Sequence, residues 1–356
     1  MKIALITDTH WGVRNDQQAF LDANKLFLDN VFFPYIDSNG VGTIIHLGDV
    51  VDRRKYVNIN TSKRLNEDFL IPIRDRGITM HIIAGNHDTY YKNTNEVNAL
   101  RELIVGRYDN TIIYDSVAET CEFDGTDILM IPWICDANRT ATMEKLRTTN
   151  AQIAMGHLEI SGFEMYRGSP QSHGDDPSVF GRFDLVCSGH YHHRSSNGNI
   201  HYLGNHSEFT WSDYNDPKGF HIFDTQTRDL TFIRNPYRMF NKVWYDDKRN
   251  KNLLDHDFEQ YKGSFVKLIV QSKEDPFGFD LFTSKLYEAG PIEVSIVEDH
   301  HHMDEISEQD LVNEAEDTLT ILSKYIGSLE TNVDNKELDK LMRTLYHEAL
   351  SMETNE

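Results

Sequence analysis

Short apolar runs that stop at glycine or aspartate recur through residues 1–235 and restrict the fold more than any other feature. "KIALIT", "GTIIHLG" and "ITMHIIAG" are rich in Ile and Leu, as is typical of short buried strands. The segment between the first two, "DQQAFLDANKLFLDNVFF", predicts an amphipathic helix, because apolar residues recur there at helical spacing: Ala19, Ala23, Leu26, Phe27 and Val31. A strand, a helix and a strand in succession predict a parallel α/β beginning. The later runs, from "TIIYDS" to "GFHIFD", have little helix between them, so we expect a second sheet packed on the first.

Length and composition agree with a large folded chain. The chain has 356 residues, of which 39% are hydrophobic. We therefore expect one large domain with appended pieces and ample material for a core. No apolar stretch approaches the roughly 20 residues that cross a bilayer, and "MKIALITDTH" does not resemble a signal peptide. Cys121, Cys135 and Cys187 are scattered, as expected for reduced thiols. The sequence therefore predicts a cytoplasmic protein without a membrane segment, in the host cytoplasm if a phage encodes it.

The pattern changes after residue 235. "SFVKLIV", "FDLFTSKLYEAG" and "IEVSIVE" predict a strand, a helix and a strand, followed by a linker, "EDHHHMDE", in which we expect His300–His302 to be exposed. In the last helical segment one apolar stripe needs a partner surface: Leu338, Leu341, Met342, Leu345 and Ala349. We therefore expect a main domain over 1–240, a small α+β domain over 241–299, and an acidic linker with partner-binding helices over 300–356.

The net charge weakens the case for a self-sufficient nucleic-acid binder. The chain carries −22, but residues 298–356 contain 16 Asp and Glu against 4 Lys and Arg, a balance of −12. Residues 1–297 therefore carry −10, and metal ions bound by carboxylates would offset part of that.

Polar side chains follow five of the expected strands, at the point where each strand ends. They are Asp8 and His10; Asp49 and Asp52; Asn86, His87 and Asp88; His157; and His190, His192 and His193. Open α/β sheets bind ligands at the carboxyl ends of their strands, so we expect one convergent site. In "CSGHYHHR", extended geometry would send His190 and His192 to one side and His193 to the other.

The residue types indicate metal chemistry. Carboxylate oxygens, imidazole nitrogens and one amide oxygen suit manganese, iron or zinc better than calcium. The candidate ligands outnumber what one ion needs: Asp8, His10, Asp49, Asn86, His157, His190 and His192. A carboxylate can bridge two ions about 3.5–4 Å apart, which is the arrangement that activates water for attack on phosphorus.

These residues carry a resemblance to a known family. The ordered motifs D-x-H, G-D-x-x-D, G-N-H-D, G-H and G-H-x-H resemble the calcineurin-like metallophosphoesterase superfamily. "GHLEISGFEMYRGSPQSHG" and "YLGNHSEFTWSDYNDPKGFHIFD" resemble the SbcD or meiotic recombination 11 type of DNA nuclease subunit, and its phage-encoded members most. The likeness covers residues 1–245 well and the remainder only in layout. It implies a two-sheet α/β/β/α sandwich with a small α+β capping domain and C-terminal helices.

The resemblance also implies roles for individual residues. One metal ion would be held by Asp8, His10, Asp49 and His192, and the other by Asp49, Asn86, His157 and His190. Asp49 would bridge the ions. His87 would donate a proton or contact the phosphate, and Asp88 would orient His87. The expected cofactors are two divalent ions, Mn²⁺ first, with Mg²⁺, Fe²⁺ or Zn²⁺ as alternatives.

The family implies a DNA exonuclease and endonuclease that acts as a homodimer with a coiled-coil ATPase of the SbcC/Rad-fifty type, bound through C-terminal helices. Two departures stand out: Asp52, where many members carry histidine, and Gly204-Asn205-His206, where glycine, serine or threonine, and proline are usual. Two alternatives remain open. One is a stand-alone phosphatase or cyclic-nucleotide phosphodiesterase on the same scaffold, and the other is a largely scaffolding subunit.

Overall fold

The computed structural model describes residues 1–250, 252–298 and 338. Met1–Asp299 form one compact unit, and residues 300–356 are divided from it. The predicted linker, His300–His302 and the predicted apolar stripe therefore lie outside the described residues, except for Leu338, which is helical and half-buried. No helix of the described part is long and apolar enough to cross a membrane.

Two six-stranded sheets form the main part of the first unit. The first has the order β14-β13-β1-β2-β3-β4, with the strands β1 (Lys2–Ile6), β2 (Thr43–His46), β3 (Thr79–Ile83), β4 (Thr111–Tyr114), β13 (Gly219–Asp224) and β14 (Leu230–Arg234). The second has the order β11-β12-β10-β7-β6-β5, with β5 (Glu119–Phe123), β6 (Thr126–Ile131), β7 (Ile153–Gly156), β10 (Leu185–Ser188), β11 (Ser195–Asn197) and β12 (Ile200–Tyr202).

The strands that precede the predicted site residues are parallel within each sheet. β1, β2, β3 and β4 run parallel, and so do β6, β7, β10 and β12, while the remaining strands are antiparallel. Parallel strands covered on both faces read as unbroken apolar runs, which is why the sequence shows them so clearly. Their carboxyl ends therefore meet at one edge of each sheet.

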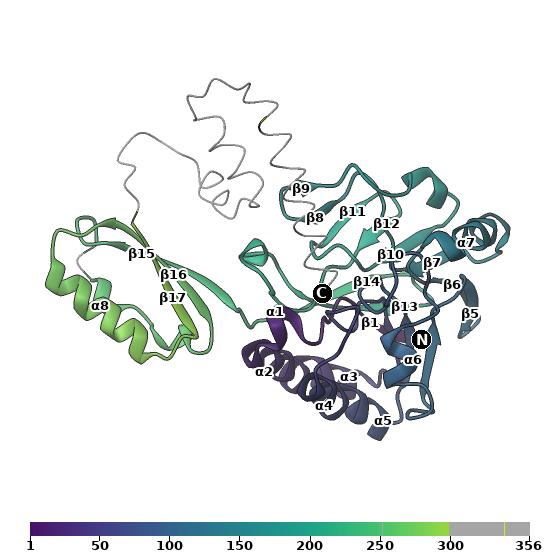
Figure 1. Cartoon of the computed structure of the whole chain (residues 1–356), viewed down its shortest axis with the longest axis horizontal. Helices are drawn as coiled ribbons and strands as arrows, with labels where there is room; N and C mark the ends of the chain where they lie inside the picture. Colours follow the sequence, from purple (N-terminus) through teal and green to yellow (C-terminus); the bar gives the residue numbers. More distant parts are fainter. Residues whose placement is uncertain (251, 299–337, 339–356) are drawn as a thin grey trace. The chain divides into compact units, whose positions relative to one another are not determined.

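Helices cover the outer faces of the two sheets (Figure 1). Those on the first sheet are α2 (Gln18–Phe27), α3 (Phe33–Asn39), α4 (Ile59–Leu65), α5 (Ile71–Asp75) and α6 (Ala99–Leu103), and α7 (Asp136–Thr148) covers the second. The short α1 (Val13–Asp16) precedes α2 and has no buried residue. Between the sheets, Leu5 and Ile45 of the first pack with Met155 of the second, and each buried side chain of this size contributes about 1.5–3 kcal/mol. The expected α/β/β/α sandwich is confirmed.

The buried face of α2 differs from the expected stripe. Phe20, Leu21, Asn24 and Phe27 are buried, whereas Leu26 is 43% exposed. Asn24 explains the difference, because its amide oxygen is bonded to His206 Nε2 at 2.9 Å and its amide nitrogen donates to the Thr9 carbonyl. A polar residue satisfied in the core interrupts the hydrophobic period that the sequence was expected to show.

A smaller α+β part follows the sandwich within the same unit. It has the parallel strands β15 (Phe240–Asp246), β16 (Phe265–Ser272) and β17 (Glu293–Glu298), with α8 (Pro276–Glu288). An aromatic cluster joins it to the sandwich: Phe20, Phe209, Met239, Phe240 and Phe265. The boundary predicted after residue 240 falls at the first residue of β15, and an independent fold for 241–299 stays a prediction.

Candidate metal centre

Five loops meet where the two sheets present the carboxyl ends of their parallel strands. They follow β1, β2 and β3 of the first sheet and β7 and β10 of the second. Three groups of side chains bring one ligand atom each within 4.8 Å of one another: Asp8, His10 and His192; Asp49, His157 and His190; and His10, Asp52 and His87. The structure thus brings the predicted residues together at one place.

The backbone is unusual at four of these positions. Asp8, His10, Asp49 and His190 have φ of 50°, 40°, 55° and 81°, the left-handed region that favours glycine. Such conformations cost of order 1–3 kcal/mol each and are held only where the surroundings impose them. Close approach of the loops also matters, because a Cβ on Gly85 would lie 2.2 Å from Asp49 Oδ1.

Asp49, Asn86 and His157 face one another through atoms that accept hydrogen bonds. His157 Nδ1 lies 2.8 Å from the Leu47 carbonyl oxygen, which fixes the proton on Nδ1 and leaves a lone pair on Nε2. That Nε2 lies 2.9 Å from Asn86 Oδ1 and 3.2 Å from Asp49 Oδ2. In this tautomer three acceptors point at one another, an arrangement that suits a bound cation.

His10 and His192 repeat this arrangement on the other side of the centre. Their Nε2 atoms are 3.1 Å apart, and His10 Nδ1 lies 3.3 Å from Asp52 Oδ1. Two ligands about 2.1 Å from one ion are about 3 Å apart when they subtend a right angle. An imidazole that turns its other N–H to a carboxylate or carbonyl is typical of metal-bound histidine, so His10 and His157 both have suitable partners.

The Asp8 carboxylate is held in place by hydrogen-bond donors from its neighbour along the chain and from the loop after β10. Its two oxygens each lie 3.1 Å from the main-chain N–H of His190, and Thr7 Oγ1 donates to Oδ2 at 2.6 Å. Burial raises the Asp8 pKa, and the negative charge of Asp49 adds to that, although His157 and His10 lower it. Two buried carboxylates in one site are costly without positive charge beside them.

The pKa values of His10 and His157 are raised, whereas burial lowers those of His190 and His192. Burial lowers the pKa of His157, but Asp49, Asp8 and the Leu47 carbonyl together raise it to about 9. Burial likewise opposes protonation of His10, yet Asp52 and Asp49 raise its pKa to about 9. The carboxylates around these two rings therefore favour positive charge, which a divalent ion would supply. The donor set and its orientation fit a metal centre.

His87 and Asp88 lie in the loop after β3. His87 is half-buried, and its Nδ1 lies 2.5 Å from the main-chain oxygen of Asp52. The buried Asp88 carboxylate accepts from the main-chain N–H of Gly85 and from three successive residues, Asp49, Val50 and Val51. Asp88 therefore joins two loops of the centre, whereas the ring of His87 is oriented by the Asp52 carbonyl and not, as expected, by Asp88.

The loop after β10 is not an extended strand, although its histidines divide as expected. β10 ends at Ser188, and His190 has a left-handed backbone. His193 turns to Asp216, with 3.0 Å between Nδ1 and Oδ1. The buried Lys218 ammonium holds this loop by donating to the His192 carbonyl at 2.9 Å, while it pairs with Asp213 at 2.7 Å and Asp216 at 2.9 Å.

Sequence reasoning missed several residues that contact the centre. Phe209 packs edge-on against His10 and His192, and Glu159 Oε1 lies 3.6 Å from His190 Nε2. Asp52, left open by the sequence, contacts His10 through its carboxylate. Glu159 stands two residues after His157 in "GHLE", which was an available signal. Phe209 gave none, because an aromatic residue in an apolar stretch predicts only a core position.

Two sheets covered by helices on both outer faces, with a carboxylate and imidazole centre at the strand ends, define a metal-dependent phosphoesterase. The family described as Calcineurin-like phosphoesterase matches residues 1–194, more than half of the chain. The chain belongs to the calcineurin-like phosphoesterase family.

Individual relatives narrow the relationship. The chain is 32% identical to Exonuclease subunit 1 of Enterobacteria phage T4, over 98% of this chain and 99% of that protein. It is 23% identical to SbcD, a subunit of the nuclease SbcCD, from Staphylococcus saprophyticus, over 65% of this chain and 67% of that protein. A solved archaeal phosphodiesterase is 15% identical over 66% of this chain and all of that one, with a TM-score of 0.32. The resemblance inferred from the ordered motifs is confirmed.

Proposed function

We propose that the chain is a DNA nuclease that hydrolyses phosphodiester bonds, as exonuclease and endonuclease, with two divalent metal ions. The observation that carries the proposal is the pair of acceptor clusters around His10 and His157, which meet at Asp49. The names of the relatives, an exonuclease subunit and a nuclease subunit, support nucleic acid as the substrate among phosphoesters.

Each acceptor cluster would hold one ion. Asp8, His10 and His192 would bind the first, and Asn86, His157 and His190 the second, with Asp49 bound to both. When bound, two such ions stabilise charge on the phosphate and make water a better nucleophile. Mn²⁺ is the expected ion, with Mg²⁺, Fe²⁺ or Zn²⁺ as alternatives, because mixed imidazole and carboxylate ligands suit borderline cations.

His87 would act on the leaving group. Its Nδ1 is fixed by the Asp52 carbonyl, so that Nε2 is the ring atom available to a substrate. A proton delivered from Nε2 to the departing oxygen would prevent build-up of negative charge there, and catalysis of this kind contributes about 10²- to 10⁴-fold.

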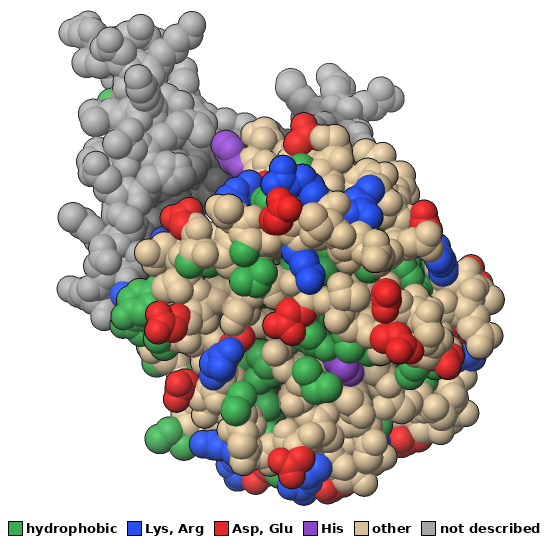
Figure 2. Space-filling view, turned by 90° about the vertical axis from the view of Figure 1, so that its right-hand side faces the viewer, with side chains coloured by type: hydrophobic (Ala, Val, Ile, Leu, Met, Phe, Trp, Pro, Cys, Tyr) green, Lys and Arg blue, Asp and Glu red, His purple; other side chains and the backbone are tan. Residues whose placement is uncertain are grey.

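Other parts of the chain would bring the substrate and a partner. Residues 241–299 would contact DNA as a cap, and residues 300–356 would bind a coiled-coil ATPase of the SbcC/Rad-fifty type; the chain would act as a homodimer. On the face shown in Figure 2, Lys and Arg side chains are interspersed with Asp and Glu. A partner that shares the contacts with DNA accounts for nuclease action by a chain with a net charge of −22.

The proposal is tested by removing metal with EDTA and restoring each ion in turn, on single-stranded, duplex and hairpin DNA, with and without the ATPase. We expect no cleavage without metal and recovery with Mn²⁺ first. Deleting residues after 300 should abolish ATPase binding and leave basal cleavage intact; binding that persists would refute the assignment of that segment.

A histidine pair separates chemistry from fold. His87→Ala should reduce the cleavage rate by about 10²- to 10⁴-fold with an unchanged circular dichroism spectrum. The matched control is His173→Ala, an exposed histidine in the segment between β9 (Ser169–Pro170) and β10, which should cleave like the wild type. Activity confined to small phosphoesters would refute the nuclease proposal and leave the phosphatase alternative.

A further inference from the structure

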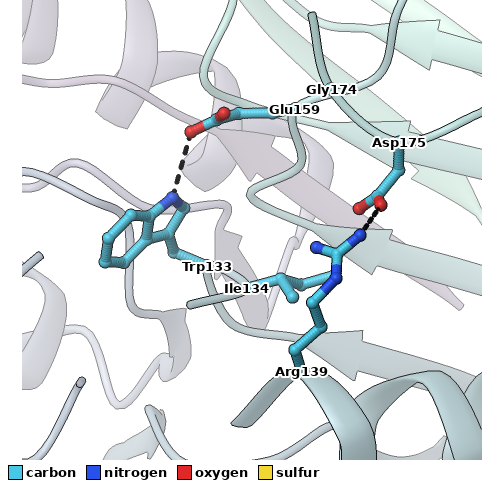
Figure 3. A pocket seen from close by; sticks show the side chains of 6 residues that line it. All are labelled: Trp133, Ile134, Arg139, Glu159, Gly174 and Asp175. Carbon is cyan, nitrogen blue, oxygen red and sulfur yellow. Dashed lines mark hydrogen bonds and ion pairs between the residues drawn. The ribbon is translucent and has the colours of Figure 1, made fainter. Parts of the chain in front are cut away.

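A polar cavity of about 250 Å³ opens beside the metal centre. Figure 3 shows its lining, in which two bonded pairs flank the cavity: the indole N–H of Trp133 donates to Glu159 Oε1 at 3.1 Å, and Arg139 is paired with Asp175. Ile134 and Gly174 complete the lining. Neither Trp133 nor Arg139 has a place in the two-metal chemistry, so the cavity is a feature that this chemistry leaves unexplained.

The cavity is fixed to the loops of the metal centre. Glu159 Oε1, on its wall, lies 3.6 Å from Nε2 of His190. The main-chain N–H of Trp133 donates to the Ala84 carbonyl at 2.8 Å, directly before the loop that carries Asn86. Whatever occupies the cavity therefore lies next to the second predicted ion position.

The chain holds this cavity open by its backbone. The Trp133 carbonyl accepts from the side-chain amides of Asn95 and Asn138 at 2.9 and 3.0 Å. On the side of Glu159 and Asp175, the two backbone segments pack so closely that a Cβ on Gly174 would lie 2.5 Å from the Glu159 carbonyl oxygen. Both walls are thus set before any ligand arrives, which lowers the entropic cost of binding.

An arginine lies against the Trp133 ring, next to the cavity. The Arg54 guanidinium lies over the Trp133 ring, 5.0 Å from its centroid, and donates to Thr89 Oγ1 and the Tyr91 carbonyl. Burial lowers the pKa of Arg54, while the negative charges of Asp49 and Glu159 raise it. Arg54 is therefore a fixed, permanently charged group within electrostatic reach of the metal centre, suited to a phosphate.

We propose that the cavity binds the base of the nucleotide next to the scissile phosphodiester, and that Arg54 contacts the phosphate that leads to it. This inference rests on the proposed nuclease function. The carboxylates of Glu159 and Asp175 accept hydrogen bonds from exocyclic amino groups, and Arg139 donates to ring acceptors. A cytosine, which presents an amino group, fits this lining, whereas thymine has no amino group to offer.

The test uses single-stranded oligonucleotides with one cleavable phosphodiester, the other linkages being phosphorothioate, and a cytosine, a thymine or an abasic residue in the neighbouring nucleotide. With the wild type and Mn²⁺, we expect cleavage next to cytosine about 5- to 100-fold faster than next to the abasic residue, with thymine between them. Arg139→Ala should reduce this ratio towards one. Arg147→Ala is the matched control, because Arg147 is also on α7 and also paired, with Glu144.

Arg54 is tested by removing the charge that it would contact. A methylphosphonate at the neighbouring linkage should slow cleavage by the wild type. Arg54→Met should already be slow on the unmodified substrate, and the methylphosphonate should slow it no further. Arg76→Met is the matched control, because Arg76 lies over the Phe33 ring and before β3, at the opposite end of that strand from Asn86. It should keep the full methylphosphonate effect.

The outcomes separate the two proposals. If the wild type cleaves no oligonucleotide, the proposed function fails. If it cleaves but the base ratio is one, or Arg139→Ala keeps the wild-type ratio, the base site is refuted while the nuclease stands. Equal methylphosphonate effects in the wild type and Arg54→Met would refute the phosphate contact. Thermal melting of each variant confirms that the fold is retained.

Discussion

Two buried carboxylates, Asp49 and Glu208, are 1% and 3% exposed and yet meet opposite surroundings. Both accept main-chain hydrogen bonds: Asp49 from His87 at 2.8 Å, and Glu208 from Met239 and Phe240 at 2.8 and 2.9 Å. Glu208 thereby anchors the start of β15 to the sandwich. Burial and main-chain donors therefore do not distinguish a proposed metal ligand from a structural acid.

The difference lies in what faces the carboxylate from the neighbouring side chains. Asp49 Oδ2 faces Nε2 of His157 at 3.2 Å and Nε2 of His10 at 3.7 Å, and both rings have their other nitrogen bonded or paired elsewhere. The chain leaves a need for positive charge at Asp49, whereas main-chain N–H groups supply both hydrogen bonds at Glu208. The side-chain nitrogens that face a carboxylate therefore indicate a metal centre better than burial of the carboxylate does.

The largest effect expected from this comparison is that of Asp49→Asn. The amide keeps the shape but loses the charge that would attract both ions, so DNA cleavage should fall by about 1,000-fold or more, with metal binding reduced in calorimetry. Circular dichroism checks the fold. Full function in Asp49→Asn, with the ATPase complex still assembled, would instead support the scaffolding alternative.

Lys218→Met removes a buried charge. Unlike Asp49, Lys218 has side chains of opposite charge within the chain as its partners. The substitution leaves Asp213 and Asp216 buried without their cation, and the His192 carbonyl without its donor, so unfolding free energy should fall by about 3–5 kcal/mol. Urea denaturation measures it. A loss below about 1 kcal/mol would show that Lys218 contributes little to holding the loop after β10.

Asp52→Asn should have an intermediate effect. Asp52 is partly exposed and would act on an ion only through His10. Loss of such a supporting carboxylate typically reduces metal affinity or activity by about 10- to 100-fold. Added Mn²⁺ should rescue much of the loss, since the ligand itself remains. A loss as complete as that of Asp49→Asn, without rescue, would assign Asp52 a direct role.

Glu208→Gln is the matched counterpart of Asp49→Asn and should have the smallest effect. Burial raises the Glu208 pKa to about 7 from its ordinary value of 4.5, although the N–H groups of Phe240 and Met239 lower it. The wild type should therefore lose stability as pH rises from 4.5 through 7. In Glu208→Gln this loss should be smaller by on the order of 1 kcal/mol. Thermal melting at pH 5 and 8 measures it; an unchanged pH dependence would contradict the raised pKa.

The sequence predicts the central strands and the metal centre for the same reason. Strands buried on both faces are apolar throughout, and the ligands follow them directly, so both stand out. Some edge strands do not: β5 reads "ETCEF", and β15 was not expected, because polar residues on an exposed face hide the strand period. Asp52, Arg54 and the Lys218 network are set by contacts between distant segments, which no local pattern reports.

The left-handed backbone at Asp8, His10, Asp49 and His190 has a consequence for how this chain tolerates change. The backbone at these positions favours glycine, and the proposed metal binding is what favours a side chain there. Selection for folding and abundance alone would therefore favour glycine at these four positions, and the resulting variants would be inactive. Libraries built to stabilise the chain need metal binding as a second criterion, because solubility and melting temperature do not report the loss of a ligand.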